Sequence, residues 1–177
     1  NSTVCEGSNI SFTTSATGTS PIHYQGYGDN GIIAGDTGVQ YQISNVDTSD
    51  EGNYYCKATN LCGSDSTNIA TLYVNTSPTI SYQSSGSAIC EGRSTTFSIT
   101  ALGTSPITYQ WYFAGNSING ATNNTYTLNS VTTSDAGNYY CKATNTCGNA
   151  QSNNINLTVN QSPSITTQPN NATKCVG

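Results

Sequence analysis

The chain has 177 residues, only 7% of them charged, and a formal net charge of −5. A surface so poor in Lys and Arg cannot neutralise a phosphate backbone, so the composition excludes nucleic acid as a partner. Seven cysteines in a small chain with few charges predict an oxidising, extracellular or cell-surface location, and no apolar run is long enough to predict a membrane span.

The sequence repeats itself with a constant period of 85 residues. The phrase DEGNYYCKATNLCG at 50–63 returns at 135–148 as DAGNYYCKATNTCG. Four cysteine pairs keep this spacing: Cys5 and Cys90, Cys56 and Cys141, Cys62 and Cys147, and Cys90 and Cys175. A fixed period indicates copies of one structural unit. We therefore predict modules at 1–75 and 76–160, and the opening of a further module at 161–177.

The first module begins differently from the second. It opens with NSTVCEG at 1–7 and has no counterpart of the segment SPTI at 77–80. We therefore predict that the first module lacks its first strand. An open sheet edge leaves backbone groups unpaired, which is unfavourable unless another segment covers it.

The second module alternates apolar and polar residues with the period of a β-strand. The predicted strands are 95–101, 107–113, 124–131, 137–144 and 154–159. Segments rich in Gly, Ser, Thr and Asn separate them at 102–106, 114–123, 132–137 and 145–149. The only helical turn predicted covers 133–136. Many short strands with regular turns predict an antiparallel sandwich.

The tail repeats the text between the modules. VNTSPTISYQSSGSAICEG at 74–92 returns as VNQSPSITTQPNNATKCVG at 159–177. Ser162, Pro163 and Ile165 therefore mark a predicted assembly strand. It either continues into another module of a longer protein or docks, over 162–169, onto the first module of a neighbouring molecule. The plainer alternative is a fragment cut from a long repeat protein. The predicted partners are copies of the chain or neighbouring modules.

Two stretches resemble immunoglobulin-like domains. YQWY at 109–112 resembles strand C, and DAGNYYCKATN at 135–145 resembles the corner between strands E and F. The resemblance implies an all-β fold of tandem immunoglobulin-like antiparallel β-sandwiches, with Trp111 in the core. It also implies two tyrosine corners, in which the phenol bonds back to the upstream backbone. Their residues are Asp50 with Tyr54, and Asp135 with Tyr139.

The chain also departs from the family. Cys56 and Cys141 match the strand F cysteine, but its strand B partner falls at Thr14 and Ile99, so the bridge between the sheets is missing. Gly26 stands where the second module has Trp111, and losing such a side chain costs roughly 3 to 5 kcal/mol. We expect the first module to be the weaker one. Its candidates for refilling the space are Tyr24, Tyr27 and Tyr41.

The remaining cysteines fall in turns. The resemblance places Cys5 and Cys90 between strands A′ and B, and Cys62 and Cys147 between strands F and G. These turns lie at opposite ends of one sandwich, roughly 20 Å apart, whereas a disulfide needs Cα atoms within about 7 Å. Three pairings stay open: Cys5–Cys147 across the junction, Cys5–Cys62 within a module, and Cys56–Cys62 across the hairpin. All seven cysteines, Cys175 included, are disulfide candidates.

No catalytic or metal site is predicted. His23 is the only histidine and has no nucleophile motif around it. The recurring C-x5-C spacing lacks a second ligand cluster, so zinc is not expected. The sequence predicts no enzyme activity and no cofactor.

The wider repeat pattern resembles the immunoglobulin-like tandem modules of large bacterial surface and secreted proteins, particularly those of the Bacteroidetes. It rests on the phrases CEG, TYQWYFAGNSINGATNNTYTL and NTCGNAQSN. It implies a stalk, an adhesin repeat or a fibre subunit. The alternative is a carbohydrate-binding accessory module of an exported enzyme, with Tyr55, Tyr112 and Tyr140 stacking on sugar rings. Surface glycans and other proteins are then further candidate partners.

Overall fold

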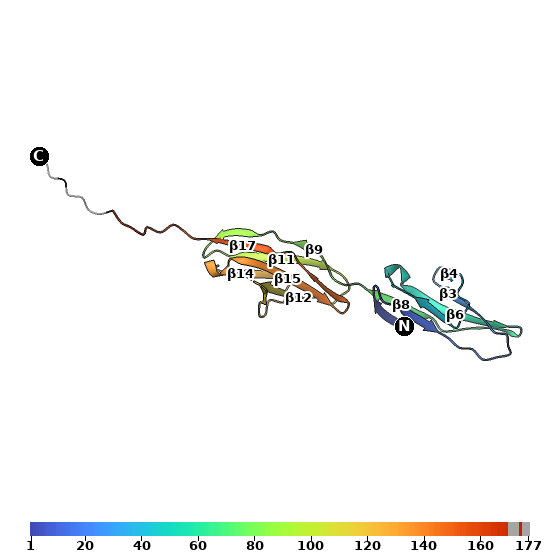
Figure 1. The fold of residues 1–177 in the computed structure, drawn as a ribbon. Helices are drawn as coiled ribbons and strands as arrows, with labels where there is room; N and C mark the ends of the chain where they lie inside the picture. The colour runs from blue at the N-terminus through green and yellow to red at the C-terminus, as the bar shows by residue number, and fades with distance from the viewer. Residues whose placement is uncertain (170–173, 175–177) are drawn as a thin grey trace. The chain divides into compact units, whose positions relative to one another are not determined.

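A computed structural model describes residues 1–169 and 174, in which strands dominate (Figure 1). The strands of the first repeat are β1 (Ser2–Cys5), β2 (Ile10–Thr13), β3 (His23–Gly28), β4 (Gly31–Ile32), β5 (Gln40–Ile43), β6 (Gly52–Asn60), β7 (Gly63–Ser66) and β8 (Ala70–Asn75). A single 3₁₀ turn, η1 (Thr48–Asp50), separates β5 from β6.

The first repeat is a sandwich of two sheets. One sheet has the order β1-β8-β6-β3-β4, with β7 pairing on β6, and the other contains only β2 and β5. Alternation along β8 explains the packing, because Leu72 and Val74 are buried while Tyr73 between them is exposed. These two side chains meet Ile43 and Val46 in a core that also contacts residues of β1 and β2.

The second repeat follows the same plan. Its strands are β9 (Thr79–Gln83), β10 (Ser87–Cys90), β11 (Thr95–Leu102), β12 (Thr108–Phe113), β13 (Asn116–Ser117), β14 (Thr125–Leu128), β15 (Gly137–Asn145), β16 (Gly148–Gln151) and β17 (Ile155–Asn160). One sheet has the order β10-β17-β15-β12-β13, with β16 pairing on β15. The other sheet, β14-β11-β9, has three strands.

The predicted all-β fold of tandem sandwiches is confirmed. The strand pairing is not wholly antiparallel, because β1 runs parallel to β8 and β10 runs parallel to β17. The short strands β10, β13 and β16 were not predicted. They are only two to four residues long, and their pairing partners rather than their own alternation define them.

The helical turn predicted at 133–136 is present as η2 (Thr133–Asp135). The Asp135 carboxylate accepts a hydrogen bond from the Thr132 N–H at 2.7 Å, and Asp50 accepts one from the Asp47 N–H at 2.9 Å. Each carboxylate thereby caps the turn that precedes β15 or β6.

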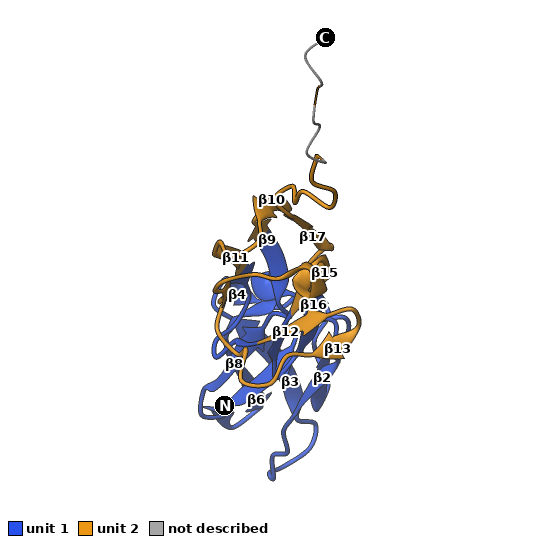
Figure 2. Ribbon diagram, turned by 90° about the vertical axis from the view of Figure 1, so that its left-hand side faces the viewer, with its two compact units in different colours: residues 1–81, 101–109, 142–151 blue, residues 82–100, 110–141, 152–177 orange. Residues whose placement is uncertain are grey.

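By its contacts the chain forms two compact units (Figure 2). Unit 1 comprises 1–81, 101–109 and 142–151, and unit 2 comprises 82–100, 110–141 and 152–177. This division does not follow the period of the sequence, because unit 1 includes two turn regions of the second repeat. The module boundaries at 75/76 and 160/161 stay a prediction.

Candidate functional site

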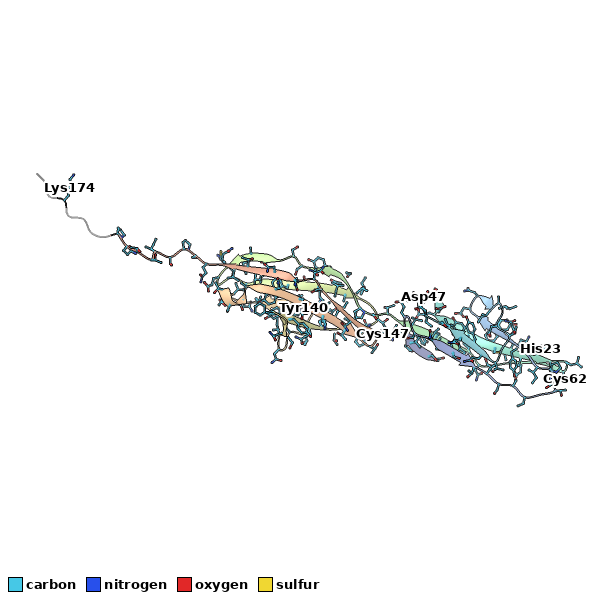
Figure 3. The ribbon with its side chains drawn as sticks, in the orientation of Figure 1. His23, Asp47, Cys62, Tyr140, Cys147 and Lys174 are labelled. Atoms are coloured by element: carbon cyan, nitrogen blue, oxygen red, sulfur yellow. A yellow bond between two sulfur atoms is a disulfide. The ribbon has the colours of Figure 1, made fainter. Side chains whose placement is uncertain are left out.

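A disulfide joins Cys5 to Cys147, with their Cα atoms 5.5 Å apart. Cys5 is the last residue of β1, and Cys147 lies in the turn between β15 and β16 (Figure 3). Both cysteines belong to unit 1. This bond is one of the three pairings that the sequence left open, and it links residues 142 positions apart in the chain.

The Asn145 side chain holds the turn that carries Cys147. Its Oδ1 accepts hydrogen bonds from the N–H groups of Cys147, at 2.9 Å, and Gly148, at 3.2 Å. Its Nδ2 donates to the carbonyls of Thr76 and Thr104, each at 2.8 Å. One amide therefore fixes the turn and binds the segment between the repeats. Asn145 was not predicted as a site residue, although the pattern N-x-C-G recurs at 60–63 and 145–148.

The other two pairings do not form in the part of the chain that the structure describes. Cys5 is already bonded to the second repeat, Cys62 is an exposed thiol, and Cys56 is a half-buried one. Cys90 is exposed at the end of β10. Cys175 lies outside the described residues.

The strand F cysteine of the second repeat is buried in the core. Cys141 and Ile99 of β11 are both almost inaccessible to solvent. A buried cysteine and isoleucine therefore take the positions at which many immunoglobulin-like domains have a disulfide between the sheets. The Cys141 N–H donates to the Ser152 hydroxyl at 2.9 Å. Burial raises the pKa of the Cys141 thiol to about 11 and also raises the pKa of Cys56. A raised thiol pKa makes a cysteine a poor nucleophile, which fits a structural role.

Both repeats contain the hydrogen bond that a tyrosine corner predicts. The Tyr139 phenol donates to the Asp135 carbonyl at 2.8 Å, and the Tyr54 phenol donates to the Asp50 carbonyl at 2.7 Å. Tyr139 also stacks on Phe113, with ring centroids 4.6 Å apart. Burial raises the pKa of Tyr139 to about 12. The repeated phrase therefore forms a structural corner between the sheets.

We expect Tyr139→Phe to lower the free energy of unfolding by about 1 kcal/mol, because the ring still packs while the Asp135 carbonyl loses its donor. Chemical denaturation followed by circular dichroism measures the change. The matched control is Tyr140→Phe, on the opposite face of β15, where the change should stay within about 0.5 kcal/mol. Equal effects of the two substitutions would contradict a structural role for the corner bond.

The two repeats differ at the core tryptophan. Trp111 is fully buried, packs near Phe97 and Tyr126, and its indole N–H donates to the Asn123 carbonyl at 2.9 Å. In the first repeat, Gly26 leaves this space to a carboxylate.

That carboxylate belongs to Asp36, which lies where a Cβ on Gly26 would point. Desolvation by burial raises its pKa. Asp36 is the counterpart of Ala121 in the second repeat. The first repeat therefore has the pair Gly26 and Asp36 where the second repeat has the pair Trp111 and Ala121. Asp36 was not predicted to fill this space, although the 85-residue period pairs it with Ala121.

The tyrosines considered for refilling that space have other places. Tyr27 stacks on Tyr55 with ring centroids 4.8 Å apart, in the same way as Tyr112 on Tyr140. The hydroxyl of Tyr24 accepts a hydrogen bond from the Ala16 N–H at 3.2 Å. Tyr41 packs against the core, as its counterpart Tyr126 does. The strands hold each tyrosine in the position of its counterpart, so the group that lies where a Cβ on Gly26 would point is Asp36.

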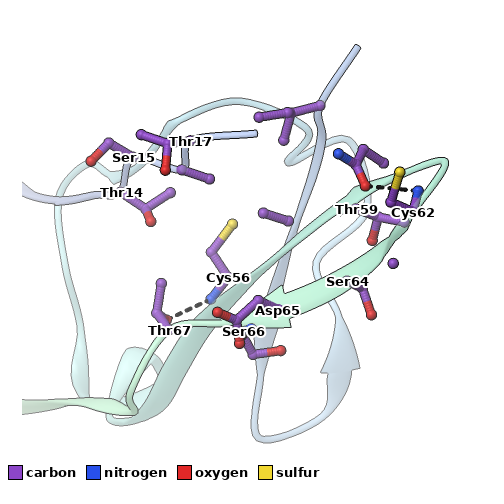
Figure 4. A pocket seen from close by; sticks show the side chains of 15 residues that line it. Thr14, Ser15, Thr17, Cys56, Thr59, Cys62, Ser64, Asp65, Ser66 and Thr67 are labelled. Carbon is purple, nitrogen blue, oxygen red and sulfur yellow. Dashed lines mark hydrogen bonds between the residues drawn. The ribbon is translucent and has the colours of Figure 1, made fainter. Parts of the chain in front are cut away.

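A cavity of about 530 Å³ opens beside Cys56 (Figure 4). Thr14, Ser15 and Thr17 line one side, and Cys56 and Thr67 lie across from them (Figure 4). In the second repeat β11 continues to Leu102 and pairs with β9, whereas β2 ends at Thr13. The cavity therefore lies where the first repeat has no third strand in its smaller sheet.

The predicted assembly strand is exposed. Ser162, Pro163 and Ile165 lie in a segment without regular structure, and Ile165 is 76% exposed. Its counterparts at the start of the second repeat are covered: Pro78 is buried and Ile80 is half-buried. The same apolar side chains are thus packed in one copy and exposed in the other.

No catalytic constellation is evident among residues 1–169 and 174. In that part of the chain, no group of three or more His, Cys, Asp or Glu side chains could hold a metal ion. His23 is exposed at the start of β3, and the Asp29 carboxylate accepts a hydrogen bond from the Asn53 N–H at 3.0 Å. None of the described helices could cross a bilayer, because each is too short or too polar.

These features define a class of protein: the chain is built of tandem immunoglobulin-like β-sandwiches. Residues 77–145 match the immunoglobulin domain family. Among curated proteins, hemicentin-2 of Mus musculus is 35% identical over 136 residues, and neuroglian of Drosophila melanogaster is 31% identical over 135 residues. Each match covers 73% of this chain but only 3% and 10%, respectively, of those proteins.

Solved structures share the fold. The I-band fragment I67–I69 of titin superposes with a TM-score of 0.77 at 23% identity, covering 90% of this chain and 62% of the titin fragment. Extracellular domains 3–5 of Drosophila OTK give a TM-score of 0.61 at 20% identity, covering 90% and 59%. The curated relatives are animal proteins, so they give no support to the bacterial type of module that the repeat pattern resembles.

Proposed function

We propose that the chain is a structural and adhesive extracellular repeat, acting as a stalk, adhesin repeat or fibre subunit that assembles head to tail. In this assembly, residues 162–169 of one copy supply the third strand that the smaller sheet of the first repeat lacks in another copy. The observation that carries the proposal is the difference between two-stranded β2-β5 and three-stranded β14-β11-β9.

The side chains of the tail suit this role. Ile165 repeats Ile80, and Gln168 repeats Gln83, whose side-chain oxygen accepts a hydrogen bond from the Asn153 N–H at 2.7 Å. Covering Ile165 would remove an exposed apolar side chain from water, which is worth on the order of 2 kcal/mol. Main-chain hydrogen bonds along the strand would add affinity, as in other cases of strand addition.

The core of the first repeat offers the complementary surface. Cys56 and Ala58 line the open cavity and are half-buried, whereas their counterparts Cys141 and Ala143 are fully buried. A strand over the cavity would restore the burial that the second repeat has. The extracellular part of the proposal agrees with one matched structure, which is described as extracellular domains.

The carbohydrate-binding alternative has less support. Tyr112 and Tyr140 stack on each other, as Tyr27 and Tyr55 do, so in each pair the facing ring surfaces are turned toward the partner tyrosine. A sugar ring binds to an aromatic face, and these four residues are half-buried. The stacking in both tyrosine pairs is explained by packing between neighbouring strands and does not favour sugar binding.

Sedimentation at rising concentration tests the assembly on the double variant Cys62→Ser with Cys90→Ser, which keeps the Cys5–Cys147 bond and lacks two exposed thiols. We expect oligomers that disappear when residues 161–177 are deleted. Ile165→Asp should also abolish them, because the docked strand would bury a charge without a partner of opposite sign. Ser164→Asp is the matched control, since its counterpart Thr79 is exposed on β9. Oligomers that persist after the deletion would refute strand docking.

A further inference from the structure

The segment between the repeats rests on a small site of the second repeat. Besides the Asn145 bonds to Thr76 and Thr104, the Ser77 hydroxyl donates to the Cys147 carbonyl at 3.0 Å. The disulfide from Cys5 ends at the same turn. Hydrogen bonds and one covalent bond therefore converge on a single hairpin turn.

Two glycines let the segment approach this closely. A Cβ on Gly103 would lie 2.9 Å from the Ser77 carbonyl oxygen, and a Cβ on Gly148 would lie 2.9 Å from the Ser77 hydroxyl. Both distances are too short for real Cβ contacts, so any side chain there would displace Ser77. We call Gly103, Asn145, Cys147 and Gly148 the linker site of the second repeat.

The first repeat carries the same four residues, which are Gly18, Asn60, Cys62 and Gly63. The turn has the same geometry: the Cys62 N–H donates to Asn60 Oδ1 at 3.0 Å, and Asn60 Nδ2 donates to the Thr19 carbonyl at 3.0 Å. Thr19 is the counterpart of Thr104.

This second linker site is open in the described chain. No atom lies within 4 Å of a Cβ placed on Gly63, whereas Ser77 covers its counterpart Gly148. The Cys62 thiol is exposed, and Asn60, Cys62 and Gly63 line the same cavity as Cys56. The site is thus continuous with the surface that the tail strand would cover.

The complementary half of the junction lies at the other repeat. Cys90 ends β10 opposite Asn160 of β17, in the same register in which Cys5 ends β1 opposite Asn75 of β8. Asn160 leads into Gln161, Ser162 and Pro163, which repeat Thr76, Ser77 and Pro78. Cys90 and these tail residues are exposed.

We propose that Cys90 of one copy forms a disulfide with Cys62 of a second copy, so that the assembled chains are covalently linked. The proposal rests on the head-to-tail docking proposed above, which brings Ser162 to the open linker site. There the Ser162 hydroxyl donates to the Cys62 carbonyl, as Ser77 does to Cys147. Each interface then repeats the Cys5–Cys147 bond that the structure contains.

The bond forms by exchange with a small-molecule disulfide such as oxidised glutathione. The Cys62 or Cys90 thiolate attacks it, one thiol leaves, and the second cysteine displaces the other thiol from the mixed disulfide. The two cysteines together lose two electrons and two protons. The electrons reduce the small-molecule disulfide, and the two small thiols that it releases carry the protons.

The full chain is incubated in a glutathione buffer and separated without reductant. We expect a ladder of covalent oligomers, and peptide mapping should identify Cys62 linked to Cys90. Cys62→Ser and Cys90→Ser should each abolish the ladder. Mixing these two variants should restore a dimer and nothing larger, because only one competent pair remains. Cys175→Ser is the matched control and should leave the ladder unchanged.

A ladder that survives Cys62→Ser, or maps to Cys62–Cys62 or Cys90–Cys90 bonds, would overturn the proposal, since it would report random oxidation of exposed thiols. Sedimentation of the double variant Cys62→Ser with Cys90→Ser, which keeps the Cys5–Cys147 bond, separates this failure from that of docking. Oligomers of this variant, together with a wild type that forms no Cys62–Cys90 bond, would refute the covalent link alone. A monomeric double variant, together with a wild type that does not cross-link, would refute both.

Discussion

Replacing both Cys5 and Cys147 with Ser is expected to lower the free energy of unfolding by about 2 to 5 kcal/mol. The disulfide closes a loop between residues 142 positions apart in the sequence. Closing so long a loop restricts the unfolded chain strongly, and the chain-entropy description gives roughly 5 kcal/mol for it. Folded proteins have a total stability of only about 5 to 15 kcal/mol, so the loss would be large.

Urea denaturation followed by circular dichroism, without reductant, measures this difference. The matched control is the double variant Cys62→Ser with Cys90→Ser, which removes two exposed thiols and should change stability by less than about 0.5 kcal/mol. Adding reductant to the wild type should reproduce the loss. If the Cys5→Ser, Cys147→Ser variant unfolds at the same urea concentration as the wild type, the disulfide does not stabilise the native chain.

Trp111→Ala is expected to cost roughly 3 to 5 kcal/mol. The indole is fully buried near Phe97 and Tyr126, so its removal leaves a cavity. The Asn123 carbonyl also loses its hydrogen bond from the indole nitrogen. Calorimetry measures the loss as a lower unfolding temperature. The exposed aromatic Tyr73 provides the control, because Tyr73→Ala removes a ring that is 50% exposed and should cost much less.

The reverse exchange tests the same cause in the first repeat. Gly26→Trp together with Asp36→Ala installs the pair found in the second repeat and should stabilise the chain by on the order of 2 kcal/mol. Gly26→Trp alone should destabilise it, because the new side chain meets the Asp36 carboxylate. The opposite order, with the single variant more stable than the double, would show that Asp36 does not occupy the tryptophan site.

The pH dependence of Asp36→Ala follows from the raised pKa of that carboxyl. A folded-state pKa above the unfolded value means that the folded chain binds the proton more tightly. The wild type therefore loses stability as the pH rises through the unfolded and then the folded pKa. The effect of Asp36→Ala on the free energy of unfolding should therefore be more stabilising at pH 7 than at pH 3.

The sequence by itself determined the features that depend on local pattern and on repetition. Alternation with period two placed the main strands, and the spacing of Asp135 and Tyr139 specified a corner bond that spans only four residues. The 85-residue period aligned the two copies position by position. It also marked Ile165 as a counterpart of Ile80. Strand alternation and the repeat period could both be predicted because they depend only on the order of residues along the chain.

The tertiary structure alone decided which cysteines pair and what fills the first core. Cys5 had two candidate partners, Cys62 and Cys147, and the choice depends on how closely the β15–β16 turn approaches the end of β1. Asp36 entered the place of Trp111 from a separate loop, and the cavity beside Cys56 exists because no strand pairs with residues 14–17. These outcomes depend on contacts between distant segments, which the local pattern of the sequence does not encode.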